Sequence, residues 1–598
     1  MKKIALISCI TLLSIFMTNT DAAAAIARKI SYTISFPEAQ AHYVDVEMNI
    51  GGTLDKTISV KMPVWTPGSY LVREFAKNVE GFTAWKGNTQ LAAKKTSKNT
   101  WEINTAGASS IKVKYRVYAF EISVRTAFVD ASHAFLSSAS IFMYPDGWLQ
   151  EPSTIKIMPY KGWDKVSTSL EKLGNDQFTV TAPNYDILFD SPIEVGNQDI
   201  FDFDVDGTHY EVAMYGGGNY DKERLKVDMS KIIREQASIF GENPNKRYVF
   251  IVHNFQRGGG GLEHLSSTVL GASRDGYANE KSYQGFLGLV SHEHFHLWNV
   301  KRLRPIALGP FNYEKENYTT NLWIAEGFTA YYEDKVIRHT QMYPVENYLA
   351  ILTGDIGNID NSQGAKIQSA AESSFDAWIK YYRPDENSSN STISYYSKGS
   401  IIAYLMDLEI INSSNAKYSL NDVMKFAYNE YYKKLGRGYT DAEFKAVVEK
   451  FAGKNFDEFY KKYVNGVDAV EHAKYLGYAG YSITNELEGT NVPSLGIATA
   501  KGDRVIVTTV ARNGSAWVDG INVNDEITAI DGSPVTDLPG LINSKKVGDK
   551  INVTVVRDGK QLVLPVTLLK ANRARYKIEP MDNATEKQLA VRKKWLKL

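Results

Sequence analysis

The chain is 598 residues long and 43% hydrophobic, a composition typical of a globular protein, and this length accommodates about three or four domains. Lys and Arg together number 68, as do Asp and Glu, so the formal net charge is +0 at pH 7. Such a chain has no overall field that attracts nucleic acid or an anionic lipid surface. We therefore expect neither as a partner.

The N-terminus has the pattern of a secretory signal peptide. Two lysines after Met1 precede an apolar run over residues 4–17, and small residues follow up to Ala25. This pattern predicts a signal peptide over residues 1–25. The run is too short to cross a membrane and no other stretch approaches the required length, so no membrane span is expected. Cys9, the only cysteine, lies inside this segment, which leaves the mature chain without disulfides. We expect an exported protein, periplasmic or secreted.

Apolar and polar residues alternate along residues 44–50, 58–64 and 111–117. Alternation with period two is typical of strands that have one buried face and one face in water. The pattern predicts an N-terminal antiparallel β-sandwich over residues 26–195.

A histidine-rich segment over residues 291–298 contains the pattern His-Glu-x-x-His at His292, Glu293 and His296. The apolar residues before it predict a buried helix, on which the two histidines lie one turn apart on the same face. Two imidazoles so placed bind one Zn²⁺, and Glu293 then reaches a water molecule at the metal. His294 points about 200° away from His292 and is interpreted as a supporting or packing residue. A helix that carries histidines by accident is the alternative, because the pattern fixes only three positions.

A third metal ligand is expected downstream of this helix. Glu326 begins a second predicted buried helix and has apolar neighbours, among them Trp323 and Phe328. A carboxylate in such a setting needs a cation partner, which a metal supplies, although a solvated helix start is the common role of a Glu before Gly. We expect one Zn²⁺ per chain on His292, His296 and Glu326, with a fourth position open for water.

The run HEHFHLWNVKRLRP over residues 292–305, with WIAEGFTAYY over residues 323–332, resembles the glycyl aminopeptidase family of zinc metallopeptidases. This family belongs to the gluzincin clan and is distantly related to the alanyl aminopeptidases, in which the gap between the second His and the Glu is shorter. The resemblance covers nearly the whole mature chain. It implies a multidomain α+β fold in which a thermolysin-like zinc catalytic domain with a helical region, residues 196–480, follows the β-sandwich.

The resemblance also implies roles for residues outside the metal set. Glu263, in Gly-Gly-Leu-Glu, matches the exopeptidase motif in which Glu binds the free α-amine of the substrate. Tyr396, in Tyr-x-Lys-Gly, matches the tyrosine that hydrogen-bonds the developing oxyanion, with Tyr395 as its nearest rival. Arg73 and Arg125 lie in segments similar to the N-terminal domain of the family. They either belong to turns and core strands or line the substrate cleft at the domain interface.

Residues 481–571 look like a PDZ domain, with the resemblance carried by residues 494–497, 514–521 and 524–532. Backbone amides around Leu495, Gly496 and Ile497 are then placed to bind the C-terminal carboxylate of a peptide that adds as a strand. Docking of this module on its own catalytic domain is an equal alternative. Residues 572–598 are expected to form a charged, partly helical tail.

Together these features predict an exported, zinc-dependent aminopeptidase that removes N-terminal residues from peptide substrates, with small residues such as Gly or Ala suggested by the family resemblance. Zn²⁺ lowers the pKa of a water molecule toward about 7, and Glu293 takes its proton as it attacks the peptide carbonyl. Zn²⁺ and Tyr396 then stabilise the oxyanion. One alternative is an endopeptidase with the same metal site. Another is an inactive PDZ-bearing peptide-binding protein, against which the complete set of chemical residues argues.

Overall fold

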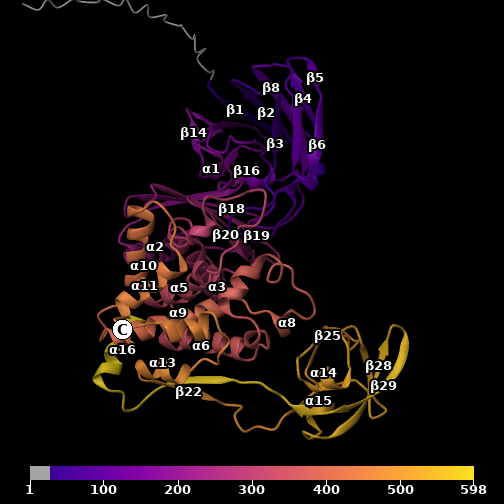
Figure 1. The fold of residues 1–598 in the computed structure, drawn as a ribbon, viewed down its shortest axis with the longest axis vertical. Helices are drawn as coiled ribbons and strands as arrows, with labels where there is room; N and C mark the ends of the chain where they lie inside the picture. The colour runs from indigo at the N-terminus through magenta and orange to yellow at the C-terminus, as the bar shows by residue number, and fades with distance from the viewer. Residues whose placement is uncertain (1–26) are drawn as a thin grey trace, which may run out of the picture.

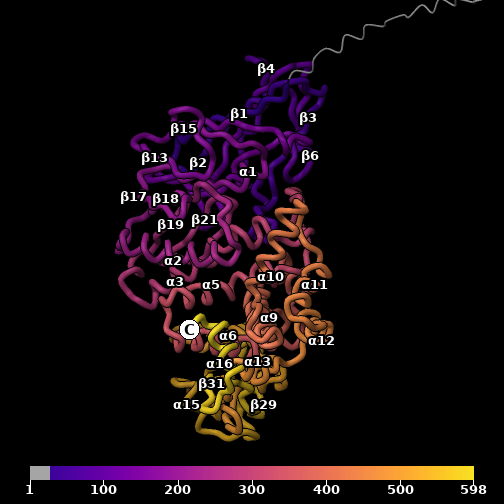
Figure 2. The backbone as a smooth tube through the Cα atoms, turned by 90° about the vertical axis from the view of Figure 1, so that its left-hand side faces the viewer, coloured from indigo at the N-terminus to yellow at the C-terminus, as the bar shows by residue number. Residues whose placement is uncertain are grey.

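The computed structural model describes residues 27–598, so the predicted signal peptide lies outside the described residues. Figure 1 and Figure 2 show three parts in a row: a β-rich N-terminal domain, a middle domain of sheet and helices, and a smaller β-rich C-terminal module. Within residues 27–598, every helix is too short or too polar to cross a membrane.

The N-terminal domain is built on an eight-stranded sheet in the order β14-β15-β12-β1-β2-β8-β4-β5. Every second residue of β2 is buried, as the alternating pattern predicted. The strands are β1 (Lys29–Ser35), β2 (Tyr43–Gly51), β4 (Val79–Lys86), β5 (Thr89–Leu91), β8 (Ser110–Tyr118), β12 (Ser153–Met158), β14 (Glu171–Leu173) and β15 (Asp176–Ala182).

Two four-stranded sheets complete this domain, in the orders β11-β3-β7-β6 and β13-β16-β10-β9. The expectation of a purely antiparallel domain is corrected at one place, because β1 and β12 pair in parallel. The chain between these strands passes through other sheets, and this long crossover allows β12 to return in the direction of β1. The added strands are β3 (Thr57–Lys61), β6 (Ala93–Ser97), β7 (Thr100–Asn104), β9 (Phe128–Val129), β10 (Ala134–Leu136), β11 (Tyr144–Pro145), β13 (Lys165–Thr168) and β16 (Ile193–Gly196).

The middle domain begins with a mixed five-stranded sheet in the order β17-β18-β19-β21-β20. Residues 248–253 are all buried and form the centre of β19, which pairs in parallel with both of its neighbours. Helices α2 and α3 pack together beside this sheet. The elements are β17 (Asp199–Val205), β18 (Thr208–Tyr215), α2 (Lys222–Phe240), β19 (Arg247–Phe255), β20 (Gly261–Glu263), β21 (Ser267–Ser273) and α3 (Glu280–Phe295).

A helical region follows, organised around α9, whose residues 401–411 are all buried. Helix α5 packs against both α3 and α9, and so joins the sheet to this region. A capping box of Thr440 and Glu443 begins α11, and Gly453 ends that helix with φ of 67°. The main helices are α4 (Leu322–Ala325), α5 (Gly327–His339), α6 (Val345–Asp360), α7 (Ala370–Phe375), α9 (Tyr395–Ser413), α10 (Leu420–Ala427), α11 (Asp441–Ala452) and α13 (His472–Tyr478).

The C-terminal module has its own small core, formed by β24–β25, the sheet β27-β26-β28-β29 and two short helices. It contacts the middle domain through Asn390, whose amide donates to the carbonyl of Val510 at 2.8 Å and accepts from the backbone of Arg512 at 2.8 Å. Its elements are β24 (Ile497–Thr499), β25 (Val507–Val510), α14 (Ser515–Asp519), β26 (Glu526–Ile530), β27 (Ser533–Pro534), α15 (Leu538–Asn543), β28 (Lys550–Arg557) and β29 (Lys560–Thr567).

The segment after this module returns to the middle domain. Strand β31 (Tyr576–Pro580) pairs antiparallel with β22 (Tyr481–Asn485) and contacts α6, while α16 (Glu586–Leu596) packs on α9 and α5. In chain order, the C-terminal module is therefore inserted between the two paired strands of this ribbon, and in space it lies beyond the end of the ribbon (Figure 1). The sequence showed only a charged, partly helical tail here, because only three side chains of α16 are buried, those of Val591, Trp595 and Leu596.

Trp595 is the residue of α16 that the core depends on most. It is 0% exposed, and its indole nitrogen donates to the hydroxyl of Tyr331 at 3.0 Å. Trp595→Ala is expected to destabilise the middle domain by about 3–5 kcal/mol, because it removes a large buried side chain and leaves a cavity. Leu589→Ala on the same helix is the control, since Leu589 is 46% exposed. Urea unfolding followed by tryptophan-independent far-UV circular dichroism measures both, and equal midpoints would show that α16 adds nothing to this core.

Two buried groups tie the N-terminal domain to the middle domain. Glu194 accepts hydrogen bonds from His133 at 2.7 Å and from His253 at 2.9 Å. Asp190 accepts one from Lys301 at 2.7 Å. Both carboxylates belong to the N-terminal domain, whereas His253 and Lys301 belong to the middle domain. These hydrogen bonds therefore connect the two domains.

Candidate active site

The two histidines of the His-Glu-x-x-His pattern lie at the C-terminal end of α3. Helix α3 begins after Asn279, whose side chain accepts from the backbone of Ser282, and His296 is its C-cap with helical φ of −59°. The rings of His292 and His296 are 4.8 Å apart. The predicted placement on one helical face therefore holds, although the second histidine lies at the last turn.

Glu326 lies between α4 and α5, at the start of the predicted second helix, and its carboxylate meets both imidazoles. Its Oε2 is 3.7 Å from Nε2 of His292 and 3.2 Å from Nε2 of His296, and its Oε1 is buried without a hydrogen-bond partner. These three side chains are all buried and their ligand atoms lie within 4.8 Å of one another. The structure thus brings together the three residues that the sequence predicted as metal ligands.

The Nδ1 atoms of both histidines are bound to hydrogen-bond acceptors. Nδ1 of His292 donates to Glu333 at 3.1 Å, and Nδ1 of His296 donates to the carbonyl of Asn299 at 2.7 Å. Because Nδ1 of each ring is bound to an acceptor, Nε2 is the nitrogen that faces the carboxylate of Glu326, and its lone pair becomes available to a metal when that position carries no proton. Lone pairs and a carboxylate converge stably only around a cation, so these residues fit a metal ion that takes His₂Glu ligands.

The pKa shifts of Glu326 and His292 also indicate a site that favours a cation. Burial alone raises the pKa of Glu326, but the charges of the neighbouring histidines outweigh it and lower that pKa to about 2. Burial alone lowers the pKa of His292, yet hydrogen bonds to Glu326 and Glu333 raise it well above its usual value. The group as a whole therefore favours positive charge between its members.

Glu333 and Asn299 are functional residues that the sequence analysis missed. Glu333 follows Glu326 by seven residues, which places it two helical turns along the same face of α5, toward His292. Asn299 also donates from its amide to the carbonyls of Ile324 at 2.9 Å and Ala325 at 3.1 Å, which fixes the last residues of α4, just before Glu326, against the end of α3. The spacing of Glu333 was a readable signal, whereas the role of Asn299 depends on a contact between two helices.

His294 does not belong to the metal set, as predicted. Its Nδ1 donates to Gln236 at 2.7 Å, and the hydroxyl of Tyr210 lies 3.2 Å from its Nε2. Burial lowers the pKa of His294 to about 3, so the ring is neutral. It packs α3 against the sheet and α2.

Glu293 and Glu263 approach each other beside the metal set. With His296 they form a second buried group whose ligand atoms lie within 4.8 Å of one another, and one carboxylate oxygen of each glutamate lacks a hydrogen-bond partner. Burial raises the pKa of Glu293 to about 7, because the lowering effect of His292 and His296 is smaller. The negative charge of Glu263 adds to the increase. A buried carboxylate with such a pKa suits a general base at neutral pH.

Glycines allow the chain to come close to these two carboxylates. Gly261 of β20 lies so near Glu293 that a Cβ there would collide with its carboxylate. From the N-terminal domain, Gly68 has φ of +87°, and a Cβ on it would lie 2.6 Å from the carboxylate oxygens of Glu263. The N-terminal domain therefore closes the cleft at Glu263.

Of the two candidate tyrosines, Tyr396 is the one whose ring lies against His292, at 6.3 Å between ring centroids. Its hydroxyl is 3.3 Å from the hydroxyl of Tyr382. Tyr395 is 0% exposed and packs in the core beneath it, with its own hydroxyl 3.5 Å from that of Tyr382. Burial raises the pKa of Tyr396 well above its usual value, so its hydroxyl keeps the proton that an oxyanion needs.

Both arginines that the sequence analysis singled out lie at the domain interface. Arg125 donates from Nη2 to the carbonyl of Gly261 at 3.1 Å, which braces β20 beside the two glutamates. Arg73 donates to the hydroxyl of Ser69 at 3.0 Å, on the turn that covers Glu263. The placement agrees with the interpretation in which these side chains line the cleft.

Tyr396→Phe is expected to lower kcat by about 10²–10³-fold, because it deletes one oxyanion donor while keeping the ring. Tyr395→Phe is the matched control and is expected to change kcat by less than about 10-fold, since that ring serves the core. Steady-state kinetics on a single peptide measures both variants. A crippled Tyr395→Phe beside a normal Tyr396→Phe would move the assignment by one residue.

Three protein-family models match the chain in order. They are the Peptidase M61 N-terminal domain over residues 31–197, M61 glycyl aminopeptidase over residues 285–402 and the PDZ domain over residues 490–568. Among solved structures, an aminopeptidase N family protein from Idiomarina loihiensis is 29% identical with a TM-score of 0.88, and the match covers 95% of this chain and 100% of that chain.

Two more distant similarities complete the comparison. An M1 zinc metallopeptidase from Deinococcus radiodurans is 12% identical with a TM-score of 0.45, over 72% of this chain and 91% of that chain. The serine protease Do-like HtrA of Lactobacillus helveticus is 45% identical over 67 residues, which is 11% of this chain and 16% of that protein. The chain thus spans only 16% of the length of this curated relative.

The class of protein is a metallopeptidase, a hydrolase of peptide bonds. It is defined by the order of the domains and by the site of His292, Glu293, His296 and Glu326. The order of the matched domains is the order of the parts in the structure. Residues 31–197 and 285–402 are therefore similar to the two domains of the M61 glycyl aminopeptidases, and residues 490–568 are similar to a PDZ domain.

Proposed function

We propose that this protein is a zinc-dependent aminopeptidase that removes N-terminal residues from peptides. The observation that carries the proposal is the pair of buried carboxylates, Glu263 and Glu293, held within 4.8 Å of each other beside the metal set. Two such carboxylates attract a cation. The free α-ammonium of a peptide is a cation that lies next to the first peptide bond.

Each residue has one role in this proposal. His292, His296 and Glu326 would hold a single Zn²⁺, which polarises the peptide carbonyl and lowers the pKa of water. Glu293 accepts the proton of the attacking water and passes it to the leaving amine. Tyr396 donates a hydrogen bond to the developing oxyanion.

Glu263 anchors the substrate, and its surroundings favour an exopeptidase over an endopeptidase. A peptide whose first residue reaches Glu263 meets the turn at Gly68, against which the carboxylate already packs. The same confinement favours a small first residue such as Gly or Ala.

The proposal includes export and a peptide ligand for the PDZ domain. Residues 1–25 have the pattern of a signal peptide, which supports a periplasmic or secreted location. In the PDZ domain, a groove of about 600 Å³ is lined by Leu495, Gly496 and Ile497 on one side and by α15 on the other. Its shape supports binding of the C-terminus of a peptide that adds as a strand. N-terminal sequencing of the protein from a periplasmic fraction tests the export.

Metal content and substrate requirements test the activity. Elemental analysis of purified active protein is expected to find one Zn²⁺ per chain, and dialysis against a chelator is expected to abolish peptide cleavage until zinc is restored. Free peptides with N-terminal Gly or Ala should be cleaved and their N-acetylated forms should not. Active protein without a stoichiometric transition metal would overturn the assignment, and efficient cleavage of acetylated peptides would make this an endopeptidase.

A further inference from the structure

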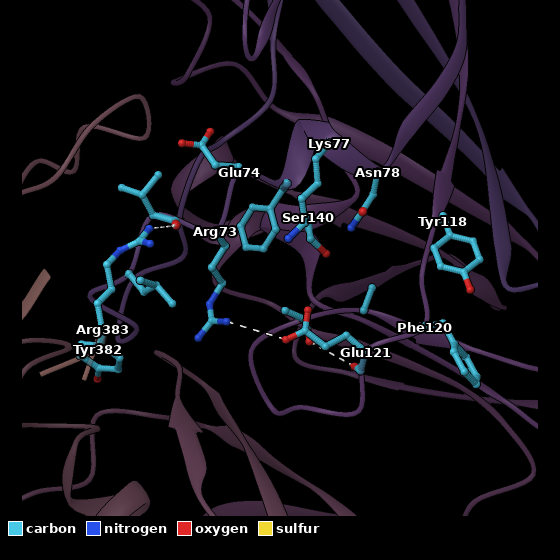
Figure 3. A pocket seen from close by; sticks show the side chains of 15 residues that line it. Arg73, Glu74, Lys77, Asn78, Tyr118, Phe120, Glu121, Ser140, Tyr382 and Arg383 are labelled. Carbon is cyan, nitrogen blue, oxygen red and sulfur yellow. Dashed lines mark hydrogen bonds and ion pairs between the residues drawn. The ribbon is translucent and has the colours of Figure 1, made fainter. Parts of the chain in front are cut away.

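A pocket of about 600 Å³ lies at the boundary between the N-terminal domain and the helical region, and none of the roles above uses it (Figure 3). Most of its wall comes from residues 71–78 and 118–127 of the N-terminal domain, and the rest includes Tyr382 and Arg383 of the middle domain. A volume of this size lies within the range of ligand sites, about 300–1,000 Å³.

The pocket is next to the candidate active site. Tyr382, one of its walls, has its hydroxyl 3.3 Å from that of Tyr396. Arg73, another wall, donates to Ser69 on the turn that covers Glu263. Two walls of the pocket therefore contact residues that lie directly beside the candidate active site.

The pocket carries more positive charge than its own carboxylates neutralise. Three cations line it: Arg73, Lys77 and Arg383. Of the two lining carboxylates, Glu74 is 2.8 Å from Lys98, which is not part of the pocket. The other, Glu121, is 58% exposed and comes no closer than 4.0 Å to Arg73.

Arg73 is the cation best placed to bind an anion. Its side chain is only 15% exposed, and its Nε and Nη2 groups donate to a neutral hydroxyl, that of Ser69. In the view of Figure 3 its guanidinium lies between Glu121 on one side and Tyr382 with Arg383 on the other. Burial and the nearby charge of Arg125 lower the pKa of Arg73. A buried arginine beside another cation gains from an anion partner.

We propose that this pocket is the subsite for the C-terminal carboxylate of short peptide substrates, which Arg73 binds with support from Arg383 and Lys77. This inference rests on the proposed function. A peptide anchored through its ammonium at Glu263 has one carboxylate that is always present, at its other end. Arginine binds a carboxylate through two parallel hydrogen bonds, which a terminal amide does not match. The enzyme would then select peptides by length as well as by their first residue.

The test compares alanine peptides of two to six residues as free acids and as C-terminal amides. The wild-type protein is expected to show a kcat/KM about 10- to 100-fold higher for the acid than for the amide at one preferred length, with the ratio falling for longer peptides. Arg73→Gln should bring this ratio close to one at the preferred length. Arg73→Lys, which keeps the charge, should retain part of it.

Two controls separate this subsite from other effects. Lys94→Gln removes a charge from an exposed strand of the same domain and should leave the ratio unchanged. A second control is a C-terminal amide peptide whose last residue is Glu. It shows whether the subsite binds a side-chain carboxylate as well as a terminal one. Preference for that peptide over the free acid would overturn the proposal, as would an acid-to-amide ratio near one at every length or a ratio that Arg73→Gln does not change.

Calorimetric binding keeps this test apart from the proposed function. The Glu293→Gln protein binds the same acids and amides without turnover, so dissociation constants give the comparison directly. If the wild-type protein cleaves none of these peptides while Glu293→Gln still binds acids more tightly than amides, only the aminopeptidase proposal is contradicted. A protein that cleaves or binds both forms equally contradicts the subsite.

Discussion

Glu293→Gln is expected to lower kcat by at least about 10²-fold while zinc stays bound, because the amide keeps the shape of the side chain but accepts no proton. The side chain is buried, and within residues 27–598 its Oε2 has no hydrogen-bond partner, so this oxygen is free to accept a proton. Steady-state kinetics and elemental analysis on the same preparation measure the two effects. Near-normal kcat in this variant would show that another group is the base.

Glu326→Ala is the matched comparison for this prediction. It removes the carboxylate that faces both imidazoles, at 3.7 Å from His292 and 3.2 Å from His296. Activity and bound zinc should fall together, whereas Glu293→Gln loses activity alone. Full zinc content in Glu326→Ala would contradict the predicted ligand set.

Glu263→Ala is expected to lower kcat/KM on free peptides by roughly 30- to several-thousand-fold. The estimate follows from about 2–5 kcal/mol for losing one partner of a buried charge pair, at about 1.4 kcal/mol per decade. N-acetylation of the substrate removes the other partner of the same pair and should cost a similar factor. Because both changes remove one interaction, the variant acting on the acetylated peptide should show little further loss.

The double comparison excludes the simpler role of Glu263 as a residue that only supports its loop. In that case Glu263→Ala would cleave free peptides almost as well as the wild type, and acetylation would add its full cost in the variant. Additive losses from the two changes would also contradict direct contact with the substrate ammonium. The readout is kcat/KM for four combinations of protein and peptide.

Local patterns in the sequence were sufficient to predict several parts of the molecule. Alternation along residues 44–50 predicts a half-buried strand because side chains point to opposite faces of a sheet. The four-residue spacing of His292 and His296 places them on one helical face for a similar reason. Glu326 was predicted because a carboxylate among apolar residues requires a cation. Each of these inferences depends only on neighbours within a few residues of the chain.

Other features were decided by contacts between distant segments. The parallel pairing of β1 with β12 depends on where the chain returns after about a hundred residues. The contact of Gly68 with Glu263 joins two domains, and the pocket around Arg73 exists only where they meet. Choosing Tyr396 over Tyr395 needed the packing around α9, since neighbouring helical residues differ by about 100° in direction.

The sequence by itself determined the strand and helix periods, the metal-binding pattern and the order of the domains. Only the tertiary structure decided which carboxylates face each other, which tyrosine faces the histidines and how the last helix packs. The physical reason is that periodicity reports which face of an element is buried, and it carries no information about what that face meets. Trp595 illustrates the difference, because α16 has only three buried side chains among charged residues, yet Trp595 lies in the core of the middle domain.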